Sequence, residues 1–381
     1  MLKLENCRER QARFLKLMES QQLDLAILSN PKTIYYFSGL LVQPQEPHAF
    51  LLTSSGKSVL VTHPPIGISP ELPPSAAGET ELYDWHSIEK DVTPTTWDHD
   101  VAARIRAVAE RLLPGSGAIG IEFESASHSV SAVVSERSGK PPANLTPEID
   151  QMRRQKDPDE IECIRQAVAL AEAGLAAVKG RLEAGMTEYK AYAIYHEAVV
   201  TKAETSFLLN GDFASGPRAV GGGGPPSNRR VQLGDLFIFD TSPVCQGYSC
   251  DFTRTFVVGR PSQLQQDAWG HVMEAHEIAR KAIRPGVPAK EIYQAMKEHL
   301  DNFEPAAGSF WHHAGHGIGM SGWEIPWLTP GSEHVIEDRE VLACEPALYA
   351  SGLQGGIRLE HDYLVTPEGA IALDHFPMGL I

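Results

Sequence analysis

Hydrophobic and polar positions along the first third of the chain alternate between helix-like and strand-like periods. A polar amphipathic stretch from Arg8 to Gln22 predicts a helix, and the apolar run Leu23 to Leu28 predicts a buried strand. The sequence HAFLLTSSGKSVLVT predicts a hairpin that turns at Ser54-Ser55-Gly56. A helical pattern from Asp98 to Leu113 and the apolar run GAIGIEF complete an alternation typical of a small α/β domain.

The segment from Ser138 to Pro147 is rich in Gly, Pro, Ser and Asn, a composition that predicts a linker. We therefore expect two domains, formed by residues 1–147 and 148–381.

The second domain begins with a well-signalled amphipathic helix. Asp157 is the expected N-cap, Pro158 suits the first helical position, and Glu160 completes a capping box. Further helix starts are expected after Thr187, after Ser262 and near Ala289. The strand candidates are the runs LFIFD, DFTRTFVVG, EVLACEPALYA and IRLEHDYLVT. This mixture of helices and hairpin strands indicates the α+β class.

Composition narrows the function classes. The chain of 381 residues has 33 Lys and Arg against 49 Asp and Glu, a formal net charge of −16. This balance argues against nucleic acid or an anionic membrane as a partner, because both are bound mainly through Lys and Arg. The sequence has no long apolar run and a polar N-terminus, so we expect a cytoplasmic protein that does not enter membranes. The five scattered cysteines favour reduced thiols.

Two aspartates lie on a predicted hairpin. The strand LFIFD ends in Asp240, and Asp251 begins the next strand after a segment that contains Pro243 and Gly247. The hairpin would bring the two carboxylates side by side, where their repulsion favours a bound divalent cation. Two ordinary surface aspartates on a solvated turn are the alternative.

Three more residues could bind metal. His316 in FWHHAGHGIGM has glycine neighbours that would let the backbone approach a bound group closely. Glu345 and Glu360 lie in apolar segments, where a carboxylate is rarely buried unless it is paired or metal-bound. Each has a structural alternative: a structural histidine, an exposed edge strand, or pairing with Arg358. Together, four carboxylates and one imidazole suit two hard or borderline divalent ions such as Mn²⁺.

With the motifs GYxxDxTRT, GHGIG, EPALY and RLE around them, these residues resemble the five-ligand signature of the pita-bread metallopeptidases of family M24. That family includes methionine aminopeptidase, Xaa-Pro aminopeptidase and prolidase, with creatinase as a metal-free relative. The resemblance covers about Glu148 to the C-terminus, and RFLKLMESQQLDLAILSNPKTIYYFSGL resembles the creatinase/prolidase N-terminal domain. It implies a pita-bread catalytic domain preceded by a smaller α/β domain.

The resemblance also implies roles for single residues. A hydroxide shared by two ions would attack an amide carbonyl, with Glu345 shuttling a proton and His312 contacting the substrate. Mn²⁺ is the expected metal, although Co²⁺, Fe²⁺ and Zn²⁺ tolerate the same ligands. The implied ligands are Asp240 on one ion, His316 and Glu345 on the other, and Asp251 and Glu360 as bridges.

The chain departs from the family pattern at two histidines that usually contact the substrate or intermediate. Trp323 stands where most family peptidases have a second catalytic histidine, and Gly223 aligns best with the other. We therefore keep open a small-molecule substrate, as in ectoine hydrolase, creatinase or dimethylsulfoniopropionate lyase. Trp323 and Trp311 could offer cation–π faces in a substrate pocket that also includes Arg358, although aromatic packing is the plainer interpretation.

The prediction is a dinuclear metallohydrolase of Xaa-Pro dipeptidase or aminopeptidase type, with a small-molecule hydrolase or lyase as the alternative. A binding module that has lost catalysis would be expected to have broken ligands, and all five are intact here. The resemblance further implies a short-peptide or small-molecule substrate and a homodimer.

Overall fold

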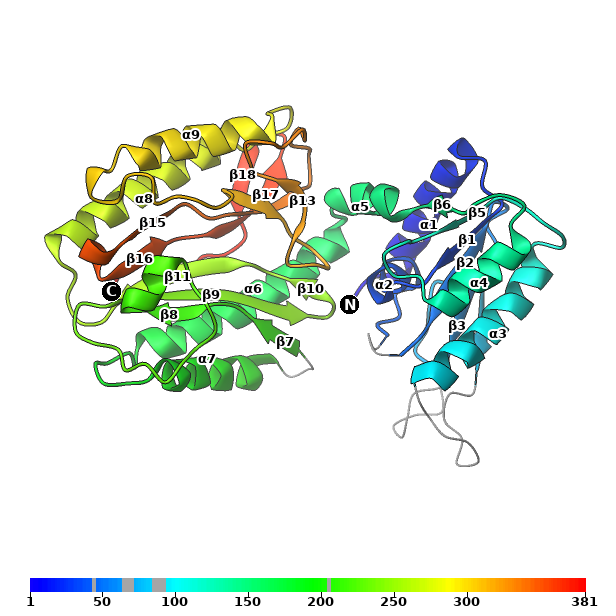
Figure 1. The fold of residues 1–381 in the computed structure, drawn as a ribbon, viewed down its shortest axis with the longest axis horizontal. Coiled ribbons are helices and arrows are strands. Elements are labelled where there is room, and N and C mark those ends of the chain that lie inside the picture. The colour runs from blue at the N-terminus through cyan, green and yellow to red at the C-terminus, as the bar shows by residue number, and fades with distance from the viewer. Residues whose placement is uncertain (43–45, 64–71, 84–93, 204–206) are drawn as a thin grey trace. The chain divides into compact units, whose positions relative to one another are not determined.

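A six-stranded sheet in the order β4-β3-β2-β1-β5-β6 organises the first of two units, Met1–Gln151 (Figure 1). The computed structural model describes residues 1–42, 46–63, 72–83, 94–203 and 207–381. The strands are β1 (Leu25–Leu28), β2 (Ala49–Thr53), β3 (Ser58–Thr62), β4 (Glu79–Leu82), β5 (Ile119–Ile121) and β6 (Ala143–Asn144). The helices are α1 (Leu4–Ser20), α2 (Pro31–Ser38), α3 (Pro94–Leu112), α4 (His128–Arg137) and α5 (Thr146–Arg154).

The α/β alternation predicted for this unit is confirmed. β1 pairs antiparallel with β2 and parallel with β5, and β2 and β3 form the predicted hairpin with Leu52 opposite Ser58. The segment predicted as a linker is instead structured, because it contains β6 and the start of α5. Leu145 between them is fully buried, and its amide donates to the Ile121 carbonyl at 2.8 Å.

The second unit, Met152–Ile381, surrounds the candidate site with three sheets. One contains β7 (Phe207–Asn210), β8 (Phe213–Ser215), β9 (Leu236–Cys245), β10 (Tyr248–Ser249) and β11 (Phe252–Val257). Another contains β12 (Gly315–Gly317), β13 (Glu324–Trp327), β14 (Val341–Cys344), β17 (His361–Thr366) and β18 (Gly369–Ala372). The third pairs β15 (Ala347–Ala350) with β16 (Gly355–Arg358). Short 3₁₀ helices span η1 (Gly216–Gly221), η2 (Glu304–Ala306) and η3 (Ser351–Leu353).

Helices lie on both sides of these sheets, with α6 and α7 on one side and α8 and α9 on the other (Figure 1). Their bounds are α6 (Pro158–Lys179), α7 (Glu188–Ala203), α8 (Gln263–Ala282) and α9 (Ala289–Asp301). They begin where the sequence predicts. The Glu160 carboxylate accepts a hydrogen bond from the Asp157 amide at 2.9 Å, and Ser262 Oγ accepts one from the Gln265 amide at 3.2 Å. Within the described ranges, no helix combines the length and apolar character needed to cross a membrane.

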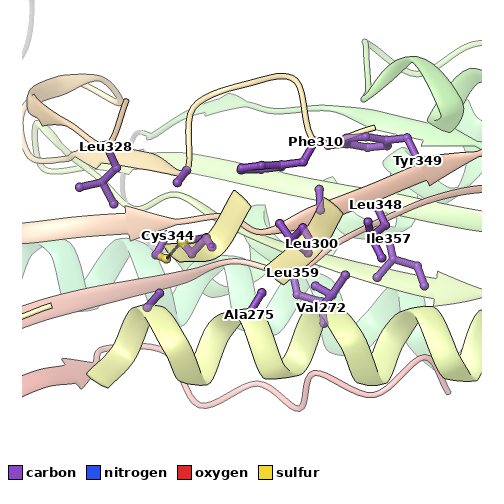
Figure 2. Packing of buried hydrophobic residues seen from close by; sticks show 14 of the residues in the cluster. Val272, Ala275, Leu300, Phe310, Leu328, Cys344, Leu348, Tyr349, Ile357 and Leu359 are labelled. Carbon is purple, nitrogen blue, oxygen red and sulfur yellow. Dashed lines mark hydrogen bonds between the residues drawn. The ribbon is translucent and has the colours of Figure 1, made fainter. Parts of the chain in front are cut away.

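The apolar core behind the site joins α8 and α9 to the strands. Figure 2 shows Val272 and Ala275 on α8, below the strands β15 and β16 that carry Leu348 and Ile357 of the same apolar cluster. All four side chains are fully buried. Burial of Val272, Leu348 and Ile357 contributes about 1.5–3 kcal/mol of transfer free energy for each side chain. This packing fixes the strands whose ends carry the candidate ligands.

Two long strands predicted from apolar runs are each divided in two. EVLACEPALYA forms β14 and β15 in different sheets, and the chain leaves the first sheet at Glu345-Pro346. IRLEHDYLVT forms β16 and β17, with the break at Leu359-Glu360. Proline cannot donate a ladder hydrogen bond, which accounts for the first break. Both interruptions fall at candidate ligands.

Candidate metal centre

The hairpin of β9 and β11 places two of the candidate carboxylates. Asp240 lies in β9 opposite Thr253, and Asp251 directly precedes β11. Asp240 also exchanges backbone hydrogen bonds with Asp212 at 2.9 and 3.0 Å. Gly211 has a φ of 142°, and a Cβ there would lie 2.1 Å from the Asp240 carbonyl oxygen, so only glycine fits this close approach.

Glu360 is tied to the same hairpin. Its amide donates to the Thr253 carbonyl at 3.1 Å, and its Oε2 atom accepts a hydrogen bond from Thr253 Oγ1 at 2.6 Å. Arg254, which follows Thr253 in the chain, is fully buried and donates a hydrogen bond to the Glu360 carbonyl at 2.6 Å. The TRT motif after Asp251 therefore holds the Glu360 backbone and side chain in place.

His316 lies on β12 with its ring oriented by the backbone. Its Nδ1 atom is 3.0 Å from the Gly317 carbonyl, which can only accept, so Nδ1 carries the proton of the neutral ring and Nε2 is a free acceptor. Nε2 lies 3.7 Å from Asp251 Oδ2 and 3.9 Å from Glu345 Oε1. An imidazole nitrogen facing two carboxylates is suited to a metal ligand.

The glycines around His316 act differently from the expectation. A Cβ at Gly315 would lie 2.0 Å from the Ala343 carbonyl oxygen, and one at Gly317 would lie 2.4 Å from that of Ile325. Gly315 also has a φ of 150°. These glycines let β12 pass close to its neighbouring strands, a role that the sequence-based interpretation did not include.

The carboxylates repel one another in a buried site. Burial, followed by the charge of Asp240, raises the pKa of Asp251 well above its usual range. Burial, followed by the charges of Asp251 and Glu345, does the same to the pKa of Glu360. Ligand atoms of Asp251, His316 and Glu360 all lie within 4.8 Å of one another, and all three residues are buried. Such a set of hard oxygen donors with one imidazole fits divalent cations, whose charge would relieve the repulsion.

Glu345 faces a group of histidines. Its Oε1 atom lies 2.8 Å from Nδ1 of His313, and its Oε2 atom lies 3.7 Å from Nδ1 of His312. Burial alone would raise the pKa of Glu345, but contact with His313, followed by electrostatic interactions with His312 and His316, lowers it to about 2. Glu345 is therefore a carboxylate at neutral pH. Sequence reasoning missed His313, for which the only signal was its place between His312 and His316.

Arg358 does not pair with Glu360, as one sequence-based alternative proposed. Its guanidinium forms ion pairs with Asp240 Oδ2 at 2.5 Å and Asp212 Oδ2 at 3.4 Å. It also donates to the Tyr349 hydroxyl at 3.3 Å and contacts the Gly222 carbonyl. Asp212 carries no sequence signal that would have linked it to the site, and Tyr349, the last residue of the EPALY motif, had no role assigned to it.

Four consecutive glycines, Gly221 to Gly224, form a loop beside the site. Besides the contact of Gly222 with Arg358, the Gly224 carbonyl accepts a hydrogen bond from the Phe213 amide at 2.8 Å. A Cβ at Gly223 would lie 2.1 Å from Asp212 Oδ2, so in this conformation the position aligned with a family histidine has no room for a side chain. Hydrogen bonds therefore hold this loop beside the site.

Exposed tryptophans lie beside two histidines of the site, Trp323 beside His316 and Trp311 beside His312. Trp323 is 68% exposed, with ring centroids 6.4 Å from His316 and 6.1 Å from Trp327. Trp311 is 65% exposed and lies 5.4 Å from the His312 ring. Both indoles therefore leave most of their surface to solvent beside the candidate ligands.

Comparison with known proteins matches two family models to this chain. Residues 162–367 match the model of metallopeptidase family M24, and residues 10–155 match that of the creatinase/prolidase N-terminal domain. An uncharacterized peptidase of Staphylococcus aureus (strain bovine RF122 / ET3-1) is 28% identical over 366 residues, which span 94% of this chain and 97% of that protein.

Two solved structures extend the likeness to the fold. Dipeptidase PepE from Mycobacterium ulcerans has a TM-score of 0.81 at 25% identity, covering 100% of this chain and 98% of that one. Prolidase from Pyrococcus furiosus has a TM-score of 0.77 at 25% identity, covering 95% and 99%. The predicted fold class, an M24-type fold after a creatinase/prolidase-type N-terminal domain, is confirmed.

Proposed function

Because the chain belongs to metallopeptidase family M24 and is a metallohydrolase, we propose that it is a dinuclear enzyme of Xaa-Pro dipeptidase or aminopeptidase type. The observation that supports this most is the buried convergence of Asp251, His316 and Glu360, with all ligand atoms within 4.8 Å of one another. The prolidase and the dipeptidase compared above share the whole fold at 25% identity, which favours a peptide substrate.

Five residues would hold the metal ions. We assign Asp240 to one ion and His316 with Glu345 to the other, and Asp251 and Glu360 would bridge them. Bound divalent ions supply Lewis acidity to a carbonyl and make water a nucleophile near neutral pH. Mn²⁺ suits this oxygen-rich set best, and Co²⁺, Fe²⁺ or Zn²⁺ would also fit.

Side chains around the ions would transfer protons and orient the metal ligands and the substrate. Glu345 is ionised and can accept a proton, while its contact with His313 keeps the carboxylate oriented. His312 Nε2 lies 3.0 Å from the Tyr349 hydroxyl, so its ring is fixed where we expect substrate contact. Arg358 is already engaged by Asp240 and Asp212, and its role would be to orient Asp240.

A second candidate function rests on the tryptophans. Trp323 replaces a histidine beside His316 and presents an exposed indole face. Such a face binds quaternary ammonium or guanidinium groups by cation–π attraction. The alternative is therefore hydrolysis or elimination on a small cationic molecule, with the same metal ligands.

Two further expectations belong to this proposal. We propose a homodimer, supported by the prolidase-like N-terminal domain, and a cytoplasmic location, supported by the acidic composition and the buried cysteine thiols.

Hydrolysis of an Xaa-Pro dipeptide panel by the Mn²⁺-loaded protein tests the substrate class. The proposal expects the enzyme to cleave Xaa-Pro dipeptides faster than the matched Xaa-Ala control dipeptides. Two bound ions per chain with no dipeptide turnover would favour the small-molecule alternative instead.

A further inference from the structure

A second group of metal-binding side chains lies in the first unit, at the end of the β2–β3 hairpin away from its turn. His48 directly precedes β2, His63 directly follows β3, and Glu46 lies two residues before His48. Ligand atoms of all three lie within 4.8 Å of one another, and both histidines are buried. We call this group the hairpin-end cluster. It shares no residue with the candidate metal centre.

Ordinary hydrogen bonding satisfies only part of this cluster. Glu46 Oε2 lies 2.8 Å from His63 Nε2 but 3.9 Å from His48 Nε2, too far for a hydrogen bond. His48 is 5% exposed, and its Nε2 atom has no hydrogen-bond partner among the described residues. Buried polar atoms nearly always have a partner, so an unpartnered imidazole nitrogen that faces a carboxylate and a second imidazole needs an explanation.

The His48 ring is oriented for ligation. Its Nδ1 atom lies 3.0 Å from Thr62 Oγ1, which holds one side of the ring and leaves Nε2 directed into the cluster. The two imidazoles lie with centroids 5.1 Å apart and planes at 27°. Burial, followed by the neighbouring His63 charge, lowers the pKa of His48 to about 3, so the ring is neutral at pH 7 as a ligand must be.

We propose that Glu46, His48 and His63 form a second metal site that binds one borderline divalent ion such as Zn²⁺. Two imidazoles and one carboxylate are a ligand set that zinc takes in proteins, with a fourth position left for water. A tetrahedral ion would require separations of about 3.3 Å between ligand atoms. Glu46 and His63, now 2.8 Å apart, would move slightly apart, and Glu46 and His48, now 3.9 Å apart, would move slightly together. The metal would join the residues before β2 to the end of β3. This inference does not depend on the proposed function.

Zinc binding by the full-length Asp251→Ala/Glu360→Ala double variant tests this site without the candidate bridging ligands. Competition with a chromogenic chelator should show one zinc ion per chain. Adding His48→Gln should weaken that binding at least tenfold, whereas adding His99→Gln, at an exposed histidine of the same unit, should not. Zinc affinity that is the same with His48→Gln and His99→Gln would overturn the proposal.

Two further measurements keep the test decisive if His48→Gln does not fold. Glu46→Gln alters a side chain that is 19% exposed, and it should also weaken zinc binding at least tenfold. X-ray absorption of the zinc-loaded double variant should show two imidazoles at about 2.0–2.1 Å. A shell of oxygen ligands alone would contradict the assignment. In the wild-type background, His48→Gln should remove one zinc equivalent and leave Mn²⁺-dependent hydrolysis unchanged.

Discussion

The Nδ1 atom of His313 lies 2.8 Å from Oε1 of Glu345, nearly 1 Å closer than the 3.7 Å between His312 Nδ1 and Oε2 of the same carboxylate. His312 is instead engaged on both sides of its ring, by the His313 carbonyl at 2.7 Å and the Tyr349 hydroxyl at 3.0 Å. The two adjacent histidines therefore have different partners. His313 contacts the candidate ligand, and His312 is fixed toward the space where we expect substrate.

This difference predicts separable effects of two matched substitutions. His313→Asn should lower Mn²⁺ affinity about 10–100-fold, because groups that orient a ligand typically contribute that much. His312→Asn should change the KM or kcat for substrate with a smaller loss of metal. Isothermal titration with Mn²⁺ and steady-state kinetics check both, with His375→Asn at an exposed position as the control. Equal losses of metal in both variants would contradict the assignment.

The candidate bridging carboxylates predict loss of metal with retention of the fold. Asp251→Ala and Glu360→Ala should each lose bound Mn²⁺ and activity together, because each removes an oxygen ligand and one of several repelling buried charges. Circular dichroism should remain close to that of the wild type. Glu368→Ala, at an exposed position of the same unit, should retain both properties. Full metal occupancy in either candidate-ligand variant would refute the bridging role.

The tryptophan beside His316 predicts a gain of function. If the missing histidine alone limits dipeptide hydrolysis, Trp323→His should raise kcat/KM about tenfold or more, since one donor to a developing oxyanion contributes about 10²–10³ in rate. Trp311→His, at an indole of similar exposure, should not. Turnover that is unchanged or lower in Trp323→His would indicate a pocket built for a different substrate.

His276 predicts an acid-sensitive fold. Burial, followed by the His361 charge, lowers its pKa to about 3, and its Nε2 donates to the Leu359 carbonyl at 2.7 Å. As the pH falls, this histidine therefore takes up a proton in the unfolded state before it does so in the folded state. Stability is retained above about pH 6.5 and falls by up to about 1.4 kcal/mol per pH unit as the pH drops toward 3.

Urea unfolding at pH 7.5 and pH 5 checks this dependence. Substituting His276→Gln should reduce the loss of stability between the two pH values by about 2 kcal/mol, because the side chain no longer titrates. The exposed control His375→Gln should behave as the wild type. An identical loss in His276→Gln and wild type would exclude His276 as the titrating group.

The sequence patterns predicted local structure better than they predicted contacts. Capping residues located α6 and α8, and alternating apolar runs located the β2–β3 and β9–β11 hairpins, because these signals depend on neighbouring residues. The apolar runs around Glu345 and Glu360 did not reveal that each run divides between two sheets. The residues before and after each division are similarly apolar, so the sequence pattern does not change there. Long-range neighbours were also missed, as the ion pair between Asp212 and Arg358 illustrates.

The central claim is that the five candidate ligands hold catalytic metal ions. The direct test is Mn²⁺ content by mass spectrometry, measured with Xaa-Pro hydrolysis on the same samples of wild type and the Asp251→Ala/Glu360→Ala double variant. We predict that the wild type binds two more Mn²⁺ ions per chain than the double variant and that only the wild type cleaves the bond. Equal Mn²⁺ content in the two proteins, or equal activity, would contradict the claim.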